Sequence, residues 1–216
     1  MKLLIASRNP DKIAEIADVL KMPALELTWL TAGDGLPEVE EDGDTFQVNA
    51  IKKAVTIALA ARLWTLADDS GLEVDALGGV PGVRSARYAG RQGDYAANNA
   101  RLLRELAGIE NRSARFRCVI ALASPSGRAQ IVEGVCEGRI LEQERGSGGF
   151  GYDPLFVPNG YDRTFAEMDS AVKNSISHRA RALCRAREAW GAVLSGSRPD
   201  WPARQAMGRG RPLDLD

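Results

Sequence analysis

The chain has 216 residues, a formal net charge of -1 and 44% hydrophobic residues, which is typical of a globular domain with a substantial core. No apolar run approaches the ~20 residues of a membrane span, and the opening apolar run is too short for a signal peptide. The near-neutral charge argues against a broad nucleic-acid surface, because such a surface must neutralise many phosphates. We therefore expect a cytoplasmic protein with neither a membrane nor a nucleic-acid partner.

The three cysteines are an odd number with no CxxC pair, so neither a disulfide framework nor a zinc site is indicated. We expect all of them to be small core residues, namely Cys118, Cys136 and Cys184. The single histidine, His178, excludes a histidine-rich metal cluster. Any metal is left to carboxylates, which favour hard ions such as magnesium.

The N-terminal segment predicts a strand, a turn and a helix. "KLLIAS" (2–7) is an apolar run of strand length, and the helix that follows has Ile13, Ile16, Ala17 and Leu20 at helical spacing. Asn9 can cap this helix, and Pro10 suits its first position. A helix that begins after a strand presents backbone N–H groups and a positive dipole end, which stabilise an anion. Ser7, Asn9 and Lys12 are candidates for such a site, although a capped surface helix explains them as well.

The rest of the chain alternates between helical and strand patterns. An alanine-rich helix is expected from Thr45 to about Leu63, a strand at "WTLADDSG" (64–71), and a helix at 93–108 with Asp94 as its cap. Two β-rich runs (115–124 and 130–140) flank the turn "PSGR" and predict an antiparallel pair with one shared face, made by Phe116, Cys118, Ile120 and Leu122.

A glycine-dense loop and a last helix complete the predicted domain. The loop "GSGGFGYDPLFV" enters a short strand, and the helix starts at about Ser177 with Leu183, Ala186, Trp190 and Val193 facing inward. Residues 196–216 show no apolar period and are expected to form a loose tail, which leaves one domain at 1–195. Strands mixed with helices in this order indicate an α/β fold with an antiparallel portion.

Two adjacent carboxylates, Asp68 and Asp69, stand at the end of an apolar run. On a regular strand they point to opposite faces. If both entered one cleft, charges ~4 Å apart would repel by a few kcal/mol, and a divalent cation would relieve that repulsion. An acidic segment before the second helix offers further ligands, Glu38, Glu40, Glu41, Asp42 and Asp44. The alternative is a surface turn beside a solvated acidic loop.

Two further motifs can bind a nucleotide. In "GGFGYDP", glycines allow close approach of a ligand, and Phe150 and Tyr152 offer faces on which a base can stack. Core packing is the alternative for both rings. In "KNSISHR", the cations Lys173, His178 and Arg179 gather where the last helix begins and oppose its dipole, which is unfavourable unless something negative lies there. Phosphate, metal and base together account for these features.

The motifs "ASRNPDK", "ADDSGLEVDALGGVPGVRSARYAG", "GGFGYDPLF", "TFAEM" and "KNSISHRARAL", in this order, resemble the inosine triphosphate pyrophosphatase family over about residues 2–194. The resemblance implies a long mixed central sheet flanked by helices, with two lobes around a deep nucleotide cleft, and a homodimer. It also implies Mg2+-assisted attack of water on the α-phosphorus of non-standard purine nucleoside triphosphates (ITP, dITP, XTP), which releases pyrophosphate and the monophosphate.

The resemblance also assigns roles by position. Asp69 matches the catalytic proton acceptor and a metal ligand, and the second ligand is Glu40 or Glu41, with Glu38 less favoured and Asp68 in a supporting place. The substrate-binding positions are Ser7, Arg8, Asn9, Pro10, Asp11, Lys12, Ser70, Phe150, Gly151, Tyr152, Asp153, Lys173, His178 and Arg179. Ser7 stands where many members have threonine, and the hydroxyl is kept.

Two other functions remain open at this stage. A related-looking pyrophosphatase acting on modified pyrimidine nucleotides would use the same phosphate chemistry. A non-enzymatic nucleotide or RNA binder would use the arginine-rich helix "HRARALCRAR" and the "GRGR" tail, which the net charge disfavours. The sequence leaves open the ranking among ITP, dITP and XTP, the dimer surface and the residue that excludes guanine.

Overall fold

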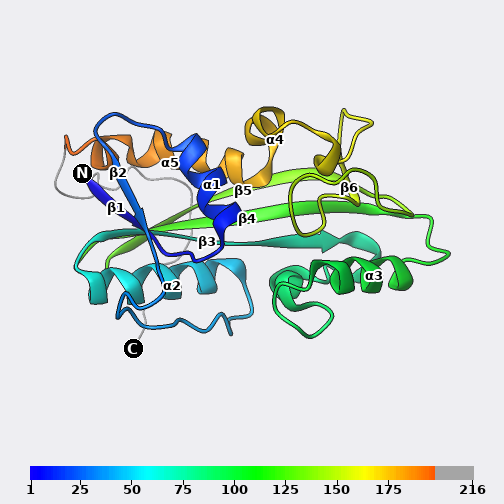
Figure 1. Ribbon diagram of the computed structural model, residues 1–216, viewed down its shortest axis with the longest axis horizontal. Coiled ribbons are helices and arrows are strands. Elements are labelled where there is room, and N and C mark those ends of the chain that lie inside the picture. Colours follow the sequence, from blue (N-terminus) through cyan, green and yellow to red (C-terminus); the bar gives the residue numbers. More distant parts are fainter. Residues whose placement is uncertain (198–216) are drawn as a thin grey trace, which may run out of the picture.

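The structure, a computed structural model, describes residues 1–197, which form a mixed sheet with helices on both faces (Figure 1). Across the sheet the strand order is β2-β1-β3-β4-β5-β6. β1 is parallel to β2 and β3, and the remaining neighbours are antiparallel. This confirms the expected mixed sheet, with strand bounds β1 (Lys2–Ile5), β2 (Glu26–Trp29), β3 (Trp64–Val74), β4 (Ser113–Ala123), β5 (Ala129–Ile140) and β6 (Phe156–Pro158).

Four of the helices begin where the sequence predicts a cap, at Asn9 and Asp94, or a helix start, at Thr45 and Ser177. The helices are α1 (Pro10–Val19), α2 (Phe46–Ala61), α3 (Tyr95–Glu105), α4 (Ser170–Ile176) and α5 (His178–Leu194). Side chains of Asn9, Thr45, Asp94 and Ser177 accept hydrogen bonds from the first turns of α1, α2, α3 and α5. No helix in residues 1–197 is long and apolar enough to span a bilayer.

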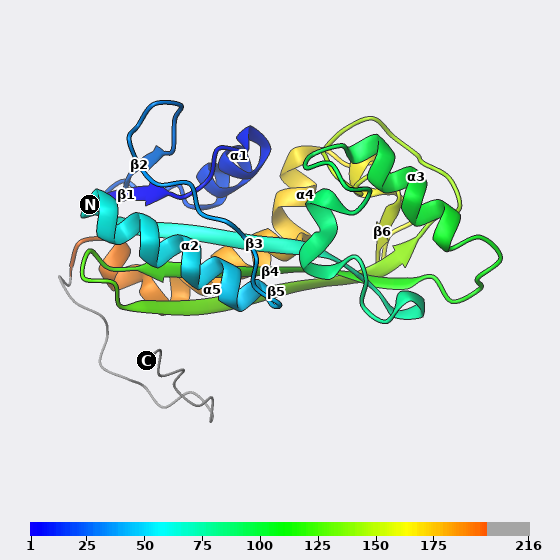
Figure 2. The ribbon, with the colours of Figure 1, turned by 90° about the horizontal axis from the view of Figure 1, so that it is seen from below.

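Alternation along the long strands divides the core between two helical layers. Leu66, Cys118, Ile120 and Leu122 pack under α1 and α5, together with three of the predicted inward residues of α5, Leu183, Ala186 and Trp190. The fourth, Val193, is also buried. Ala67, Val119 and Ala121 pack on the other face against the apolar side of α2. Figure 2 shows α2 and α5 on opposite sides of β3, β4 and β5. The period of two in the strands therefore decides which helix covers which side chain.

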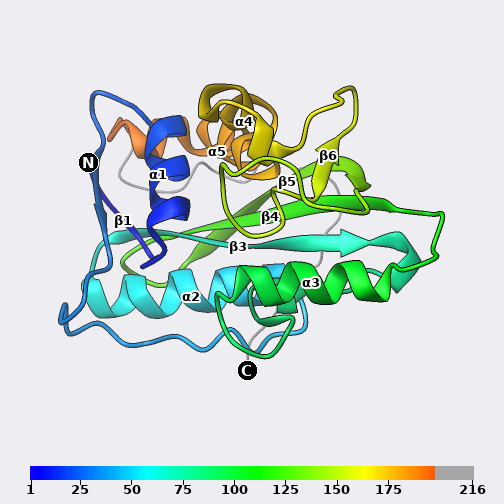
Figure 3. The same cartoon turned by 45° about the vertical axis from the view of Figure 1, so that its right-hand side comes forward.

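The C-terminal half of β3 and the parts of β4 and β5 beside it carry a further core, the far core, at the end of the sheet away from β1. Leu72, Phe116 and Cys136 pack there with Leu102 of α3 and with aromatic residues of segment 152–168. The predicted shared face of Phe116, Cys118, Ile120 and Leu122 thus spans two cores. The view in Figure 3 shows α3 beside the far end of β3, whereas α2 runs beside its near end.

The unequal lengths of β1 and β3 leave one strand edge open. β1 pairs with β3 only from Leu3 opposite Trp64 to Ile5 opposite Leu66. β3 continues to Val74 with β4 along its other edge. From Ala67 onward, the edge of β3 that no longer pairs with β1 is therefore open to side chains of other elements. The two adjacent aspartates, Asp68 and Asp69, lie in this stretch.

Several expectations differ from the structure. The sequence patterns did not predict β2 or α4, and α3 ends at Glu105, short of the predicted stop at Gly108. Cys184 is exposed on α5, so its prediction as a core residue is wrong, whereas Cys118 and Cys136 are buried. The predicted loose tail falls almost wholly on residues 198–216, outside the described residues. The division into two lobes stays a prediction.

Substitution by alanine is expected to have opposite effects on stability at two glycines, Gly134 and Gly191. A Cβ at Gly134 of β5 would lie 2.1 Å from the backbone oxygen of His178 and 2.4 Å from the nitrogen of Ala182, whereas Gly191 of α5 has nothing within 4 Å. Gly134→Ala should lower the free energy of unfolding by ~1–3 kcal/mol through overpacking. Gly191→Ala should raise it by ~0.5–1 kcal/mol through helix propensity.

Urea unfolding followed by circular dichroism measures both variants. Equal effects of the two substitutions would contradict the close packing of α5 on β5.

Candidate active site

A cavity of about 530 Å³ lies where the open edge of β3 meets the first turn, the acidic segment, α2 and the α4–α5 junction. The structure brings all the predicted substrate-binding residues to this cavity, together with Asp69: Ser7, Arg8, Asn9, Pro10, Asp11, Lys12, Ser70, Phe150, Gly151, Tyr152, Asp153, Lys173, His178 and Arg179. Glu38 and Glu41 also line it, whereas Glu40 is exposed and does not. Their individual roles stay predictions.

The first turn is held by its own polar side chains. Asn9 Oδ1 accepts from the backbone nitrogens of Asp11 and Lys12, at 2.9 and 3.2 Å, and Ser7 Oγ accepts from the nitrogen of Asn9 at 3.2 Å. These bonds fix the start of α1, whose dipole favours an anion. Arg8 is largely exposed and pairs with Asp34, so it lies at the rim.

Asp68 and Asp69 point to opposite faces of β3, as regular strand geometry predicts. Asp68 turns towards α1 and α5, where its Oδ2 lies 3.1 Å from Lys12 Nζ and 3.0 Å from Arg179 Nη2. Burial alone would raise the pKa of Asp68, but Lys12 and Arg179 outweigh it and hold that pKa well below its usual range. Asp68 is therefore an ionised partner of buried cations, not the acid or base of the site.

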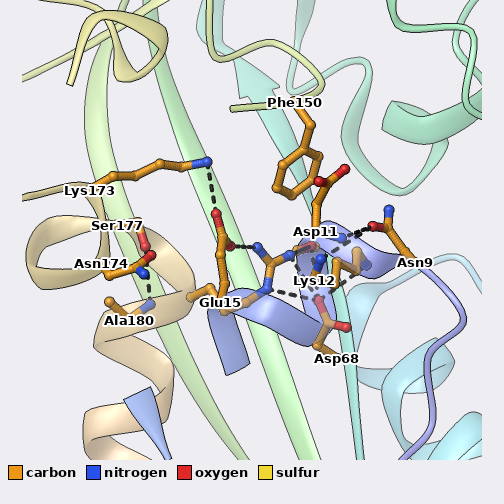
Figure 4. Close-up of polar contacts among 12 residues, drawn as sticks. Asn9, Asp11, Lys12, Glu15, Asp68, Phe150, Lys173, Asn174, Ser177 and Ala180 are labelled. Atoms are coloured by element: carbon orange, nitrogen blue, oxygen red, sulfur yellow. Dashed lines mark hydrogen bonds and ion pairs between the residues drawn. The ribbon is translucent and has the colours of Figure 1, made fainter. Parts of the chain in front are cut away.

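The ion pairs continue away from Asp68 along α1. Glu15 pairs with Arg179 and, through Oε1 at 2.8 Å, with Lys173 Nζ, which also pairs with Asp153. Figure 4 shows Lys12, Glu15 and Asp68 converging, with Lys173 reaching Glu15 beside the ring of Phe150. Sequence reasoning missed Glu15. The available signal was its position three residues after Lys12, on the same face of α1.

The expected conflict of three cations at one helix start does not occur. Lys173 lies in the last turn of the separate helix α4, where the dipole favours a cation. His178 stacks on Phe116 with ring centroids 4.7 Å apart. Burial, followed by the nearby Arg179 and Lys173, lowers the pKa of His178 well below its usual value, so the imidazole is neutral. Only Arg179 is charged at the start of α5, and it is paired.

Asp69 lies on the α2 side of the strand, close to the acidic segment. Its Oδ2 accepts from Asn49 Nδ2 at 2.9 Å, and its Oδ1 accepts from the nitrogen of Ser70 at 2.9 Å. Burial first, and then the carboxylate of Glu41, raise the pKa of Asp69 to about 6. Lys53 Nζ pairs with Glu41. A carboxylate poised near neutral pH beside a second carboxylate suits both proton transfer and metal binding.

Sequence reasoning also missed Asn49 and Lys53. Both are buried on α2, four residues apart, so they share one face of the helix. Two polar residues at this spacing in an otherwise apolar helix were the available signal.

The two aromatic residues predicted to stack a base have different surroundings. Lys173 Nζ lies 4.7 Å and Arg179 Cζ 5.9 Å from the ring centroid of Phe150. Tyr152 is buried in the far core, and its hydroxyl donates to the backbone oxygen of Ser85 at 2.9 Å. Phe150 thus stays a candidate for stacking a base, whereas Tyr152, although it lines the cavity, is packed in the core as the alternative predicts.

The small residues after Asp69 serve chain packing. A Cβ at Gly71 would lie 2.4 Å from both the oxygen of Gly82 and Ser85 Oγ. Ser85 Oγ also accepts from the nitrogen of Leu72 at 2.9 Å. Gly71 thus lets the short 3-10 helix Gly82–Arg87 pack directly on β3, which closes one side of the cavity.

Few side chains of the cavity are placed to bind a metal ion. Within residues 1–197 no cluster of three or more His, Cys, Asp or Glu side chains is placed to hold a metal. Asp69 and Glu41 supply carboxylate oxygens alone, the ligands of a hard cation. Magnesium characteristically binds one or two protein carboxylates and completes its shell with water and substrate phosphates. The donor set therefore fits Mg2+ bound together with a phosphorylated substrate.

The chain is similar in sequence to curated dITP/XTP pyrophosphatases and in fold to a solved HAM1 protein. It is 54% identical over 190 residues to the dITP/XTP pyrophosphatase of Desulforamulus reducens, covering 87% of this chain and 94% of that protein. It is 48% identical to the dITP/XTP pyrophosphatase of Bacillus subtilis, covering 83% and 92%. A solved HAM1 protein from Coxiella burnetii superposes with a TM-score of 0.81 at 40% identity, covering 88% of this chain and 98% of that one.

These relatives confirm the resemblance that the motifs predicted. The model of the Ham1 family matches residues 3–189, nearly all of the described chain. On this match and these identities, the chain belongs to the Ham1 family.

Proposed function

We propose that this protein hydrolyses non-standard purine nucleoside triphosphates, ITP, dITP and XTP, to the monophosphate and pyrophosphate. One observation carries the proposal: a single cavity sets the Asp69 and Glu41 carboxylates against Lys12, Lys173 and Arg179, with the Phe150 ring beside two of these cations. A metal, a triphosphate and a flat base together satisfy this arrangement. Relatives about half identical to this chain carry the name dITP/XTP pyrophosphatase.

In this mechanism the protein positions groups and moves one proton. Asp69, with a pKa of about 6, is ionised at neutral pH and accepts the proton of the water that attacks the α-phosphorus. The hydrogen bonds from Asn49 and Ser70 orient its two oxygens. Lys12 and the N-terminus of α1 hold phosphate oxygens. A magnesium ion bound by Asp69 and Glu41 would supply charge neutralisation and a more acidic water.

The base is chosen by hydrogen-bond donors around an aromatic face. A purine stacked on Phe150 brings its 6-substituent towards the ammonium of Lys173 and the guanidinium of Arg179, which only donate. The 6-oxo group of hypoxanthine or xanthine accepts such a bond. The 6-amino group of adenine is itself a donor, so it would face these donors without accepting a hydrogen bond and would leave its own N–H groups unpaired, which is costly.

The remaining expectations belong to the same proposal. We expect a homodimer in the cytoplasm, which light scattering and cell fractionation would test. The RNA-binding alternative is weakened by the arginines of α5, because Arg181 and Arg185 donate to the backbone oxygens of Val135 and Glu133 and so help to hold α5 on β5.

Incubation with ITP and Mg2+ should release pyrophosphate and IMP in equal amounts. Release of orthophosphate and IDP would contradict attack at the α-phosphorus. We expect ATP to be turned over at least about 10²-fold less efficiently, because the 6-amino group cannot accept the buried hydrogen bonds. Modified uridine and thymidine triphosphates serve as the comparison, and faster turnover of these would favour the pyrimidine alternative.

Asp69→Asn should lower kcat by ~10²–10⁴-fold, because the base is lost. The same variant should be more stable than the parent at pH 7.5 without divalent cations. The pKa of Asp69 is raised from 3.8 to about 6, so the folded protein binds this proton more tightly than the unfolded chain does. The stability contributed by Asp69 is thus present below pH ~4 and is lost as pH rises through about 6, at a cost of roughly 1–3 kcal/mol.

Urea unfolding in EDTA, at pH 4 and pH 7.5, measures this effect. The stability gain of Asp69→Asn over the parent should be larger at pH 7.5 than at pH 4. A gain that does not depend on pH would rule out a raised pKa at this carboxyl, and undiminished turnover would remove Asp69 as the base.

Glu41→Gln and Glu40→Gln separate the two candidate metal ligands. Glu41 lines the cavity and Glu40 does not. Glu41→Gln should raise the Mg2+ concentration for half-maximal activity by ~10–100-fold, as loss of an anionic donor predicts. Glu40→Gln should leave it within twofold of the parent, and the reverse pattern in a Mg2+ titration would assign Glu40 instead.

A further inference from the structure

The side chain of Asn49 in α2 forms two hydrogen bonds with the backbone of the acidic segment at Gly43. The nitrogen of Gly43 donates to Asn49 Oδ1 at 2.8 Å, and Asn49 Nδ2 donates to the oxygen of Gly43 at 3.3 Å. Both backbone groups of one residue are thus bound by one side-chain amide, in the manner of a strand neighbour. Gly43 lies two residues after Glu41, so this pair of bonds sets where the Glu41 backbone runs.

The same amide also binds Asp69. Asn49 Nδ2 donates to Asp69 Oδ2 at 2.9 Å, in a site where Asn49 is 1% and Asp69 4% exposed. Both Nδ2 hydrogens and the oxygen of the amide are then used. The reversed orientation would place the NH2 group against the Gly43 N–H, and the oxygen against a carboxylate and a carbonyl, so the partners themselves determine which atom is which.

Gly43 shows independently that this contact is close. A Cβ added at Gly43 would lie 2.7 Å from Asn49 Oδ1 and 2.7 Å from Val48 Cγ1. Any larger residue would push the acidic segment away from α2. Three other contacts hold the same segment: Lys53 pairs with Glu41, Arg87 Nη2 donates to the oxygen of Glu41 at 2.8 Å, and Lys52 Nζ pairs with Asp42 Oδ1 at 2.6 Å.

We propose that Asn49 is the positioning residue that fixes the spacing of the Asp69 and Glu41 carboxylates, so that both address one divalent cation. The inference rests on the proposed function for the presence of that cation. Asn49 itself is not among the residues that line the cavity. It joins the strand that carries one carboxylate to the loop that carries the other. The rigid α2 helix thus sets a distance that would be variable if the loop were not attached to it.

The test measures cation binding without catalysis. Mn2+ binding to the nucleotide-free protein, followed by water-proton relaxation, should weaken by ~10–100-fold in Asn49→Ala, the usual loss when a residue supporting a metal ligand is removed. The Gly43 amide should exchange its hydrogen faster in the cation-free variant. At saturating Mg2+ the KM for ITP should stay within about threefold of the parent, because the groups around Phe150 are unchanged.

Asn98 of α3 offers a matched control. It is also 1% exposed. Its side chain also hydrogen-bonds to backbone groups: it accepts from the nitrogen of Ala89 at 2.7 Å and donates to the oxygen of Ser85 at 3.3 Å. Asn98→Ala should cost comparable stability in urea unfolding while Mn2+ affinity stays within twofold of the parent. Equal losses of Mn2+ affinity in the two variants would overturn the inference, since general loosening would then explain both.

Gly43→Ala attacks the contact from the loop side and keeps Asn49 intact, so it serves if Asn49→Ala does not fold. It should weaken Mn2+ binding in the same direction, and Mn2+ affinity within twofold of the parent would overturn the inference. A parent protein that hydrolyses ITP and binds Mn2+, with an Asn49→Ala variant that does both equally well, would refute the role of Asn49 alone. A parent that does neither would refute the proposed function, and the inference with it.

Discussion

The ion pairs around Asp68 are the contact on which the site depends. Asp68 is buried on β3 and pairs with Lys12 of α1 and Arg179 of α5. It therefore joins three elements that are far apart in the chain. Burying a charge is costly unless partners replace its hydration, so α1, β3 and α5 must meet at this point for any of the three charges to be tolerated. Glu15 then adds Lys173 and α4 to the same network.

The adjacent Asp69 has a different environment because a strand turns neighbouring side chains to opposite faces. Asp68 faces cations, which hold its pKa well below the usual range. Asp69 is buried near Glu41, and both burial and that carboxylate raise its pKa to about 6. Two identical residues, next to each other, are thus divided into a permanent anion and a group that can exchange a proton near neutral pH. The early end of β1 opens the strand edge from which both are reached.

The acidic segment gains its order from α2. Asn49 and Lys53 stand one helical turn apart and bind Gly43 and Glu41. These bonds give the segment a definite path despite its several carboxylates. The cavity therefore has a cationic wall built on α1, α4 and α5, and an anionic wall formed by Glu41 of the acidic segment and Asp69 of β3. A triphosphate and a metal ion have complementary charges to these walls.

The sequence by itself determined the caps of α1 and α3, the starts of α2 and α5, the antiparallel pair β4–β5 and the motif residues that line the cavity, because these depend on local spacing and on motifs of consecutive residues. Only the tertiary structure placed Glu41 at the cavity and Glu40 outside it, assigned Tyr152 to the core, revealed Glu15, Asn49 and Lys53, and placed Lys173 on its own helix. These depend on which elements pack together in space. An ion pair between residues more than a hundred positions apart leaves no periodicity in the chain.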